Sequence, residues 1–322
     1  MRSLRGISCL TVGLLAGLAF VGCERESRLP QEKEYFAKDA KPTAKEVIKI
    51  CRDAGYTGAA DLFEKGLLPC VRLAPCTGTS SRVVSKIGGL PHLPDPTLWP
   101  KHQGKSLSFI AQINLQELPG NLPKDILPQK GMLYFFYDAK QATWGYDPKD
   151  KGSWRVLYTE NLPEGVQAVS CPADIPEEAR FKEKLVQLQD DFSLPEPSEA
   201  LSTASLSDDQ EDAVYEIYDQ FKERRSPWHQ LLGHADPIQG DMKLECQLVS
   251  HGLYCGDGTG YDDPKAKVLA PGAAQWRLLL QIDTEEDLGM MWGDSGRLYF
   301  WITEDDLRNK RFENVWMVSQ CY

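Results

Sequence analysis

An ordered internal repeat constrains the fold more than any other feature of this sequence. SFIAQINLQEL resembles RLLLQIDTEEDL, and both place Gln and Ile inside an apolar run. GMLYFFY then resembles GRLYFWI, with Gly, Leu, Tyr and Phe at matching places. A looser match between WRVLY and VWMVSQ follows in the same order, and collinear matches of this kind indicate an internal duplication. The matched pairs are 108–118 with 277–288, 131–137 with 296–302, and 154–158 with 315–320.

The repeated segments predict β-strands, because they are rich in aromatic and branched apolar residues. The segments 108–115, 131–137, 277–283 and 296–302 each carry too many apolar residues for one exposed face, so these four strands should be mostly buried. We therefore expect an α+β fold that is internally duplicated, with two related antiparallel β-rich halves and helices between and around them. Repeat one spans about 85–160, and repeat two spans about 229–322. The expected strands are 108–115, 132–137, 154–158, 277–282, 297–302 and 315–321.

Helical signals lie mainly outside the repeats. A capping box begins at Thr43, and 207–225 and 241–250 each start at a capping residue. Residues 176–192 place Phe181, Leu185 and Leu188 at roughly helical spacing. We expect these four segments and 59–65 to be helices. Residues 171–225 hold 15 acidic and 6 basic residues, so a helical acidic insertion is expected at about 172–226, with a solvated surface.

The N-terminus resembles that of a bacterial lipoprotein. Arg2 and Arg5 precede an uncharged run at 7–21, which is too short to span a bilayer as a helix. The run ends in AFVGC at Cys23, which resembles a lipobox, although Phe20 replaces the usual Leu. We expect a signal peptide at 1–22, a lipidated Cys23 and a polar tether through residue 42. The alternatives are an ordinary signal peptide or an uncleaved anchor.

Seven cysteines remain after the signal peptide and Cys23, and an odd number cannot all pair. At most one disulfide is expected, within the group of Cys51, Cys70 and Cys76. Cys246 and Cys321 are expected to be reduced and buried, as small hydrophobic residues.

Composition and motifs exclude several function classes. A formal net charge of −11 argues against nucleic-acid binding. The sequence has no phosphate loop, dinucleotide fingerprint or nucleophile elbow, so no cofactor or catalytic residue is predicted. Neither CxxC pairs nor zinc-like His spacing occurs, so no metal site is predicted either.

Three further motifs have both a functional and a structural interpretation. GDSG at 293–296 resembles a protease segment, but its place in the repeat favours a turn before a strand. The acidic, glycine-rich loop at 255–263 could hold calcium, although a rigid turn is the preferred interpretation. Trp99, Trp292 and Trp301 could form an aromatic platform for a sugar, although core packing is the commoner use.

A ligand site is predicted at the loops that precede equivalent strands. These loops, 85–100 and 229–241, should lie at related positions, and a groove between the two halves would be the natural site. We expect the groove to contain His92, Trp99, Gln112, His234, Asp236 and Gln281.

The same stretches resemble the YwqG-like family, a bacterial domain of unknown function. The residues that carry the resemblance are SKIGGLPHLP, LSFIAQINL, LLGHADPIQGDMKLECQLVS, GLYCGDGTGYDDP and MMWGDSGRLYFWI. The resemblance implies one α+β domain over 43–322, and it brings no known activity, cofactor or catalytic residue.

Two functions remain open for this chain. The first is a non-enzymatic binding or interaction module, held at the cell envelope by its lipid, with an unknown protein or envelope ligand as partner. The second is a hydrolase of envelope polymers that uses carboxylates such as Asp236, Asp241 or Asp294. Carboxylates with raised pKa in a cleft would favour the enzyme.

Overall fold

The computed structural model describes residues 33–77, 83–120, 122–201 and 206–322. One compact unit spans Tyr35–Tyr322 and contains all the helices and strands of the described residues. The predicted signal peptide, Cys23 and the first half of the predicted tether, up to residue 32, lie outside the described residues. Among the described residues, no helix is both long enough and apolar enough to cross a membrane.

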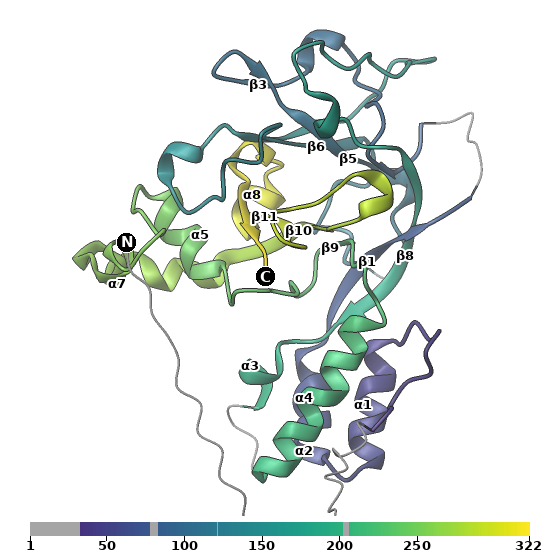
Figure 1. Cartoon of the computed structure of the whole chain (residues 1–322), viewed down its shortest axis with the longest axis vertical. Coiled ribbons are helices and arrows are strands. Elements are labelled where there is room, and N and C mark those ends of the chain that lie inside the picture. The colour runs from purple at the N-terminus through teal and green to yellow at the C-terminus, as the bar shows by residue number, and fades with distance from the viewer. Residues whose placement is uncertain (1–32, 78–82, 121, 202–205) are drawn as a thin grey trace, which may run out of the picture. The chain divides into compact units, whose positions relative to one another are not determined.

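A ten-stranded antiparallel sheet forms the body of this unit, with helices packed around it, so the fold is α+β as predicted (Figure 1). The strand order is β12-β11-β10-β9-β1-β8-β2-β5-β6-β7. Its two central strands are β1 (Leu68–Pro75) and β8 (Lys184–Ser193), which pair over eight residues. Two four-stranded arms extend from this central pair, one from each side.

Each arm begins with a strand of two residues and continues with three longer strands. Arm one consists of β2 (Lys86–Ile87), β5 (Ser108–Asn114), β6 (Met132–Tyr137) and β7 (Trp154–Thr159). Arm two consists of β9 (Gln230–Leu231), β10 (Trp276–Asp283), β11 (Arg297–Thr303) and β12 (Trp316–Gln320). The six longer strands agree with the predicted ones, and β5, β6, β10 and β11 are almost entirely buried, as expected.

The registers of the two arms correspond closely. The pairing of β5 with β6 shifts between Phe109 and Ala111, and that of β10 with β11 shifts between Leu278 and Leu280. Gln112 follows Phe109 by three residues and lies opposite Tyr134. In the same way, Gln281 follows Leu278 by three residues and lies opposite Tyr299.

The two free ends of the sheet meet, which makes the sheet nearly a barrel. Trp154 at the start of β7 donates from Nε1 to the Val315 carbonyl at 2.8 Å. Trp316 at the start of β12 donates to the Gly145 carbonyl at 2.7 Å. The two indole rings pack edge to face with centroids 4.9 Å apart. This closure covers edges that would otherwise expose unpaired backbone groups.

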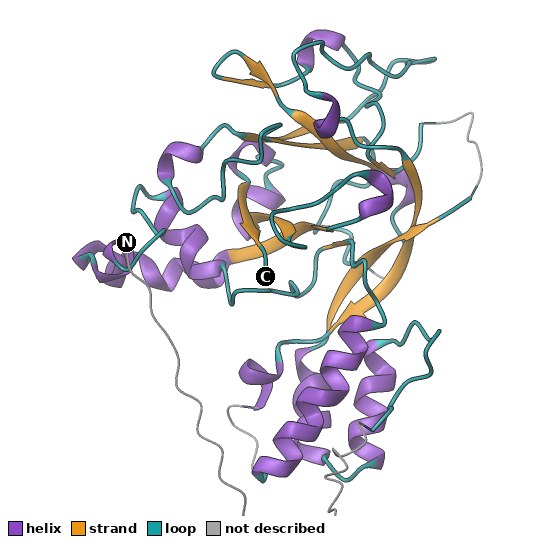
Figure 2. Ribbon diagram, viewed as in Figure 1, coloured by secondary structure: helices purple, strands orange, loops and turns teal. Residues whose placement is uncertain are grey.

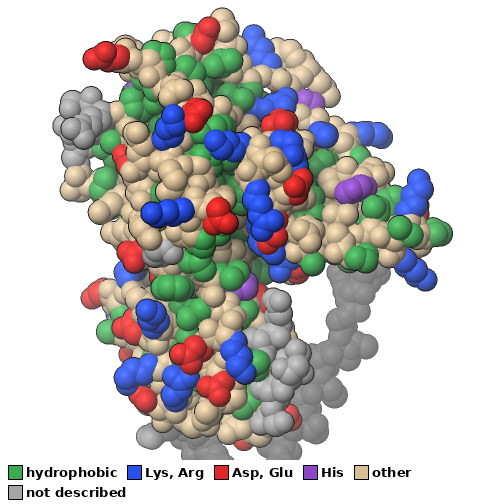
Figure 3. Space-filling model, turned by 180° about the vertical axis from the view of Figure 1, so that it is seen from behind, with side chains coloured by type: hydrophobic (Ala, Val, Ile, Leu, Met, Phe, Trp, Pro, Cys, Tyr) green, Lys and Arg blue, Asp and Glu red, His purple; other side chains and the backbone are tan. Residues whose placement is uncertain are grey.

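Four helices pack together next to the β1–β8 pair (Figure 2). Their shared core includes Val47, Phe63, Ile217 and Phe221, and Trp228 packs edge to face on Phe221. The capping boxes predicted at Thr43 and Ser207 are both present. Lys, Arg, Asp and Glu are interspersed over the helical surface (Figure 3). These helices are α1 (Ala44–Asp53), α2 (Thr57–Gly66), α3 (Pro197–Leu201) and α4 (Asp208–Glu223).

The remaining helices are short and belong mainly to arm two. The predicted helix at 241–250 is α5 (Lys243–Ser250), and the Asp241 side chain accepts from the Lys243 N–H at 3.3 Å. The others are α6 (Thr259–Asp262), α7 (Pro264–Leu269) and α8 (Glu304–Arg308). A separate hairpin joins β3 (Lys101–His102) to β4 (Lys105–Ser106).

The helix predicted at 176–192 is wrong. A short 3₁₀ turn at Glu177–Ala179 leads into strand β8, so the acidic insertion is helical only in its later part. Buried Val186 and Leu188 alternate with exposed Gln187 and Gln189, which is the two-residue period of a strand. Pairing with β1 on one side and β2 on the other outweighs the helix-like spacing.

The seven cysteines of the described residues are all free. Cys51, Cys70 and Cys76 therefore form no bridge, and Cys76 is exposed. Cys246 is buried as predicted, and burial raises the pKa of its thiol well above the usual value. Cys321 is only half-buried, which corrects the prediction for that residue, because it follows the last strand instead of lying within it.

We predict that Gln112→Met and Gln281→Met each destabilise the fold. Gln112 bonds the His92 N–H and the Val84 carbonyl, and Gln281 bonds the Asp236 N–H and the Trp228 carbonyl. Each unpaired buried group costs about 1–3 kcal/mol, so urea unfolding should show a loss of ~2–5 kcal/mol per variant.

Gln187→Met is the matched control, because Gln187 is exposed on β8. Its free energy of unfolding should stay within about 0.5 kcal/mol of wild type. Equal losses in all three variants would contradict the bridging role of the two buried glutamines.

Candidate functional site

Strand β9 is too short to fill the space between its two neighbours. It pairs only with Val71 and Arg72 of β1 and with Leu280 and Gln281 of β10. The first residues of β1 and β10 therefore have a paired strand on one side only. The sides of these residues that face one another therefore have no paired strand between them in the described part of the chain.

Two cavities meet at this opening, and we call them together the trough. Lobe one has a volume of 380 Å³ and lobe two a volume of 460 Å³, a size typical of ligand sites. Both lobes are lined by Leu68 of β1, by Gly233, and by Arg277 and Leu278 of β10. The two cavities thus share the residues that flank the end of β9.

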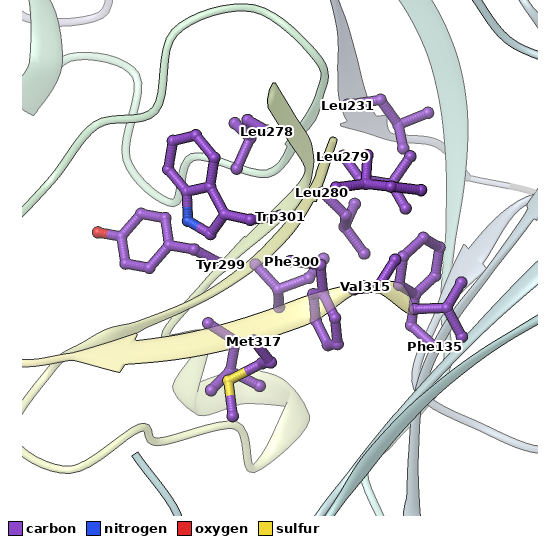
Figure 4. Close-up of a cluster of buried hydrophobic side chains, with 14 of the residues drawn as sticks. Phe135, Leu231, Leu278, Leu279, Leu280, Tyr299, Phe300, Trp301, Val315 and Met317 are labelled. Atoms are coloured by element: carbon purple, nitrogen blue, oxygen red, sulfur yellow. The ribbon is translucent and has the colours of Figure 1, made fainter. Parts of the chain in front are cut away.

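The lobes lie toward opposite faces of the sheet. Leu278 pairs with Trp301, so these side chains share one face with Trp276, and all three line lobe one. Arg277 points to the other face and binds Glu304, which lines lobe two, at 2.5 Å. Figure 4 shows Trp301 and Leu278 on the side of the strands away from Phe135.

Each lobe combines an apolar floor with charged groups of both signs. In lobe one, Met242, Trp276 and Trp301 are buried, and in lobe two Leu232 and Leu307 are buried. The charged residues are Glu196, Asp241 and Lys243 in lobe one, Asp125, Glu304 and Arg308 in lobe two, and Arg277 in both.

Two local features at the trough are energetically unfavourable. The indole Nε1 of Trp301 is buried and has no hydrogen-bond partner among the described residues, whereas buried Trp N–H groups usually have one. Leu232 has φ 60°, a left-handed conformation that a bulky residue rarely adopts. Strain of this kind tends to occur at functional sites.

Glu196 connects lobe one to buried charges behind it. Its Oε1 accepts from the Tyr218 hydroxyl at 3.3 Å and lies 3.8 Å from Lys222 Nζ. Lys222 also lies 2.6 Å from the buried carboxylate of Asp236. Burial raises the pKa of Glu196 despite the nearby Lys222, which acts in the opposite direction. The buried position of Glu196 thus favours its protonated form.

Asp236 has a structural role. It accepts from Arg297 Nη1 at 2.5 Å, and Arg297 Nε binds Asp283 at 2.9 Å. Its carbonyl also accepts from the Tyr299 hydroxyl at 2.7 Å. Burial alone would lower the pKa of Arg297, but the two carboxylates raise it above its usual value. A buried carboxylate held this tightly is a poor candidate for acid–base chemistry.

A smaller cavity stands at the corresponding place in arm one. Lobe one contains Gly233 and Leu278, and the small cavity contains Gly89 and Phe109 beside β2, with a volume of only 160 Å³. Gly88 donates to the Ile110 carbonyl at 2.8 Å, as Leu232 donates to that of Leu279 at 3.3 Å. Gly88 and Gly89 carry the left-handed backbone that Leu232 and Gly233 adopt in arm two.

Neither the trough nor the small cavity brings the six predicted groove residues together. His234 lines lobe one and Trp99 lines the small cavity of arm one. The other four form two separate pairs. His92 with Gln112 and Asp236 with Gln281 are each joined by a 2.9 Å bond from a backbone N–H to a glutamine Oε1. The polar glutamines therefore hold loops in place and line neither the trough nor the small cavity.

The other motifs also have structural roles in the described residues. Residues 293–296 form the turn before β11, with Gly293 and Ser295 at positive φ, which agrees with the turn interpretation. In the acidic loop, Asp257 and Asp263 accept from backbone N–H groups at the starts of α6 and α7. The described residues contain no group of three His, Cys, Asp or Glu placed to hold a metal ion.

Trp99, Trp292 and Trp301 are at most 7 % exposed, which agrees with the preferred interpretation of core packing and not with an aromatic platform. The important residues that sequence reasoning missed are Leu68, Glu196 and Arg277. The only sequence signal for Glu196 is its place between two prolines, and the only signal for Arg277 is a basic residue beside an apolar run.

We predict that the buried His229 makes the protein lose stability in acid. Burial, with Lys184 nearby, lowers the pKa of His229 from 6.5 to about 3. Its Nδ1 accepts from the Asp283 N–H at 3.1 Å, which requires an unprotonated nitrogen. Between pH 6.5 and about 3 the unfolded chain binds a proton that the folded chain does not. The free energy of unfolding should therefore fall by up to about 1.4 kcal/mol per pH unit as pH decreases.

Urea titrations at several pH values, with wild type and His229→Gln, measure this effect. The variant should show a smaller decrease between pH 6.5 and 4, whereas His102→Gln, which keeps His229, should behave as wild type. Parallel curves for wild type and His229→Gln would contradict the assignment.

Comparison with known proteins gives a family and no activity. No curated protein matches the chain. A family model described as "Domain of unknown function (DUF1963)" matches residues 85–321, which include nine of the ten strands of the sheet and the whole of arm two. The chain therefore belongs to the DUF1963 family.

Proposed function

We propose that this protein is an envelope-anchored lipoprotein whose folded domain binds a ligand in the trough without chemical turnover. The observation that supports binding most directly is the trough itself, a two-lobed cavity with an apolar floor and charged groups of both signs. The unpaired Trp301 N–H and the strained Leu232 lie at the same place. A ligand oxygen could provide the acceptor that Trp301 lacks among the described residues.

The anchoring part of the proposal rests on the sequence. Arg2, Arg5 and the uncharged run before Cys23 support a signal peptide, and the small residue before Cys23 supports acylation. Two finer statements also stay proposals: that the chain falls within the YwqG-like group, and that its two arms arose by duplication. The mirrored strand order, the matching register shifts and the matching glutamine contacts support the duplication.

A second candidate function is a hydrolase, and Glu196 favours it. Its raised pKa is a property of a general acid, and Asp241 lines the same lobe as a possible second carboxylate. Binding is preferred because Glu196 already accepts from Tyr218 and lies near Lys222, while Asp241 is largely exposed beside Lys243.

The anchoring proposal predicts that Cys23→Ser abolishes lipid attachment. Cells grown with radiolabelled palmitate should label wild type and leave the variant unlabelled, because only the acylated cysteine carries the fatty acid. Cys76→Ser is a suitable control, because Cys76 is an exposed thiol that the proposal leaves unmodified. Equal labelling of wild type and Cys23→Ser would overturn the anchor.

The binding proposal predicts that a photoreactive residue in the trough captures envelope material. Leu68 is 40 % exposed and lines both lobes, and Leu98 is 46 % exposed and lines neither, so the two positions are matched in residue type and exposure. With p-benzoylphenylalanine at each position in living cells, mass spectrometry should find an adduct at 68 and none at 98. Absence of any adduct specific to 68 would sink the binding proposal.

If the protein is a hydrolase, its action on the envelope should differ from that of a binding module. It would release soluble fragments from isolated envelopes, and Glu196→Gln would stop that release without reducing the yield of the adduct at position 68. A binding module releases nothing in either form.

A further inference from the structure

We infer that the trough binds an extended polypeptide segment, which lies as an added strand between β1 and β10. This inference rests on the proposed binding function and names its occupant. It comes from the sheet register, from the two lobes and from the comparison between the two arms.

The width of the opening suits one extended chain. β1 and β10 flank β9, so beside it they lie roughly 9.6 Å apart, twice the usual strand spacing, and the opening begins where β9 ends. A helix, at about 10–12 Å in diameter with its side chains, is too wide for this space. A saccharide usually needs an exposed aromatic face, but Trp276 and Trp301 are only 3 % and 2 % exposed.

The two lobes match the side-chain pattern of a strand. Successive residues of a strand point to opposite faces of the sheet. Lobe one lies toward the face that carries Trp301, and lobe two lies toward the face on which Arg277 meets Glu304. Apolar side chains of the occupant would thus enter the lobes alternately. Its backbone would extend the sheet, as in other cases of strand addition.

The corresponding opening in arm one is closed, and the difference is local. In the central pair, Val71 of β1 lies opposite Leu231 of β9, and Lys184 of β8 lies opposite Ile87 of β2. Leu68 stands three residues before Val71, and Phe181 stands three residues before Lys184. Leu68 and Phe181 therefore occupy corresponding places in the two arms. The Phe181 carbonyl accepts from the Gly89 N–H at 3.0 Å. The Leu68 carbonyl accepts instead from the Ser193 hydroxyl, at 3.3 Å.

Side-chain volume reinforces this difference. Phe109 and Phe181 line the small cavity of arm one, where Leu278 and Leu68 line the trough. Both residues are larger in the closed arm, so replacing the two leucines by phenylalanine should fill the trough with the side chains that arm one already accommodates.

The test begins with a display library of random segments of about six residues, the usual length of a strand. The full-length chain in detergent serves as target, and the double variant Leu68→Phe with Leu278→Phe removes segments that bind elsewhere. Leu98→Phe, an exposed leucine outside the trough, is the control variant. We expect enriched segments with alternating apolar residues that bind wild type and Leu98→Phe and lose at least tenfold in affinity for the filled variant.

Backbone methylation then separates an added strand from a loosely held peptide. Methylating the N–H groups of a selected peptide one at a time should weaken binding about three- to tenfold at each residue between the two strands, because successive N–H groups of an inserted strand face β1 and β10 in turn. Amide exchange at Arg277 and Leu278 should slow in the complex. Methylation without effect at every residue, or protection elsewhere only, would contradict strand addition.

Failure of this inference is distinguishable from failure of the binding function. If no segment is enriched over the filled variant and the adduct at position 68 is a lipid or a glycan, the trough still binds a ligand and the peptide inference is wrong. If position 68 gives no adduct at all, the binding function fails with it.

Discussion

The antiparallel pairing of β1 with β8 is the interaction on which the rest of the structure depends. Eight residue pairs, from Leu68 with Ser193 to Pro75 with Val186, join two strands that carry everything else. Arm one attaches to β8 and arm two attaches to β1, each through a strand of only two residues. The helical core also packs against Phe192 of β8 and includes Leu194, which directly follows β8, so loss of the central pair would separate three parts of the domain at once.

These two-residue joints also explain where the trough lies. A short strand leaves the ends of its longer neighbours unpaired, and each arm resolves this in its own way. Arm one fills the space with aromatic side chains and allows the backbone turn through Gly88 and Gly89. Arm two keeps the space open, places Leu232 in a strained conformation and leaves the Trp301 N–H without a partner among the described residues. One architecture thus contains a filled and an unfilled version of the same position.

The parts of this fold that sequence could predict are those with a strong local pattern. The apolar runs of the arms and the capping boxes at Thr43 and Ser207 needed no tertiary information. β8 could not be recognised because its apolar spacing resembles a helix and Asp190 and Asp191 interrupt it, and β1 contains Pro69, Arg72 and Pro75, which obscure the pattern of a strand. The family match also begins after β1. The trough was missed because it arises from the unequal lengths of neighbouring strands, a property of no single segment.

The separation of the two central strands in sequence affects the order in which the domain can form. Leu68 and Ser193 lie 125 positions apart, so β1 emerges from the ribosome long before its partner exists. The longer strands of each arm are connected to near neighbours and can associate locally, whereas the central pair must close a long loop. Folding of this chain is therefore expected to be slow and to finish at its centre, with β1 exposed as an unpaired edge until the later residues arrive.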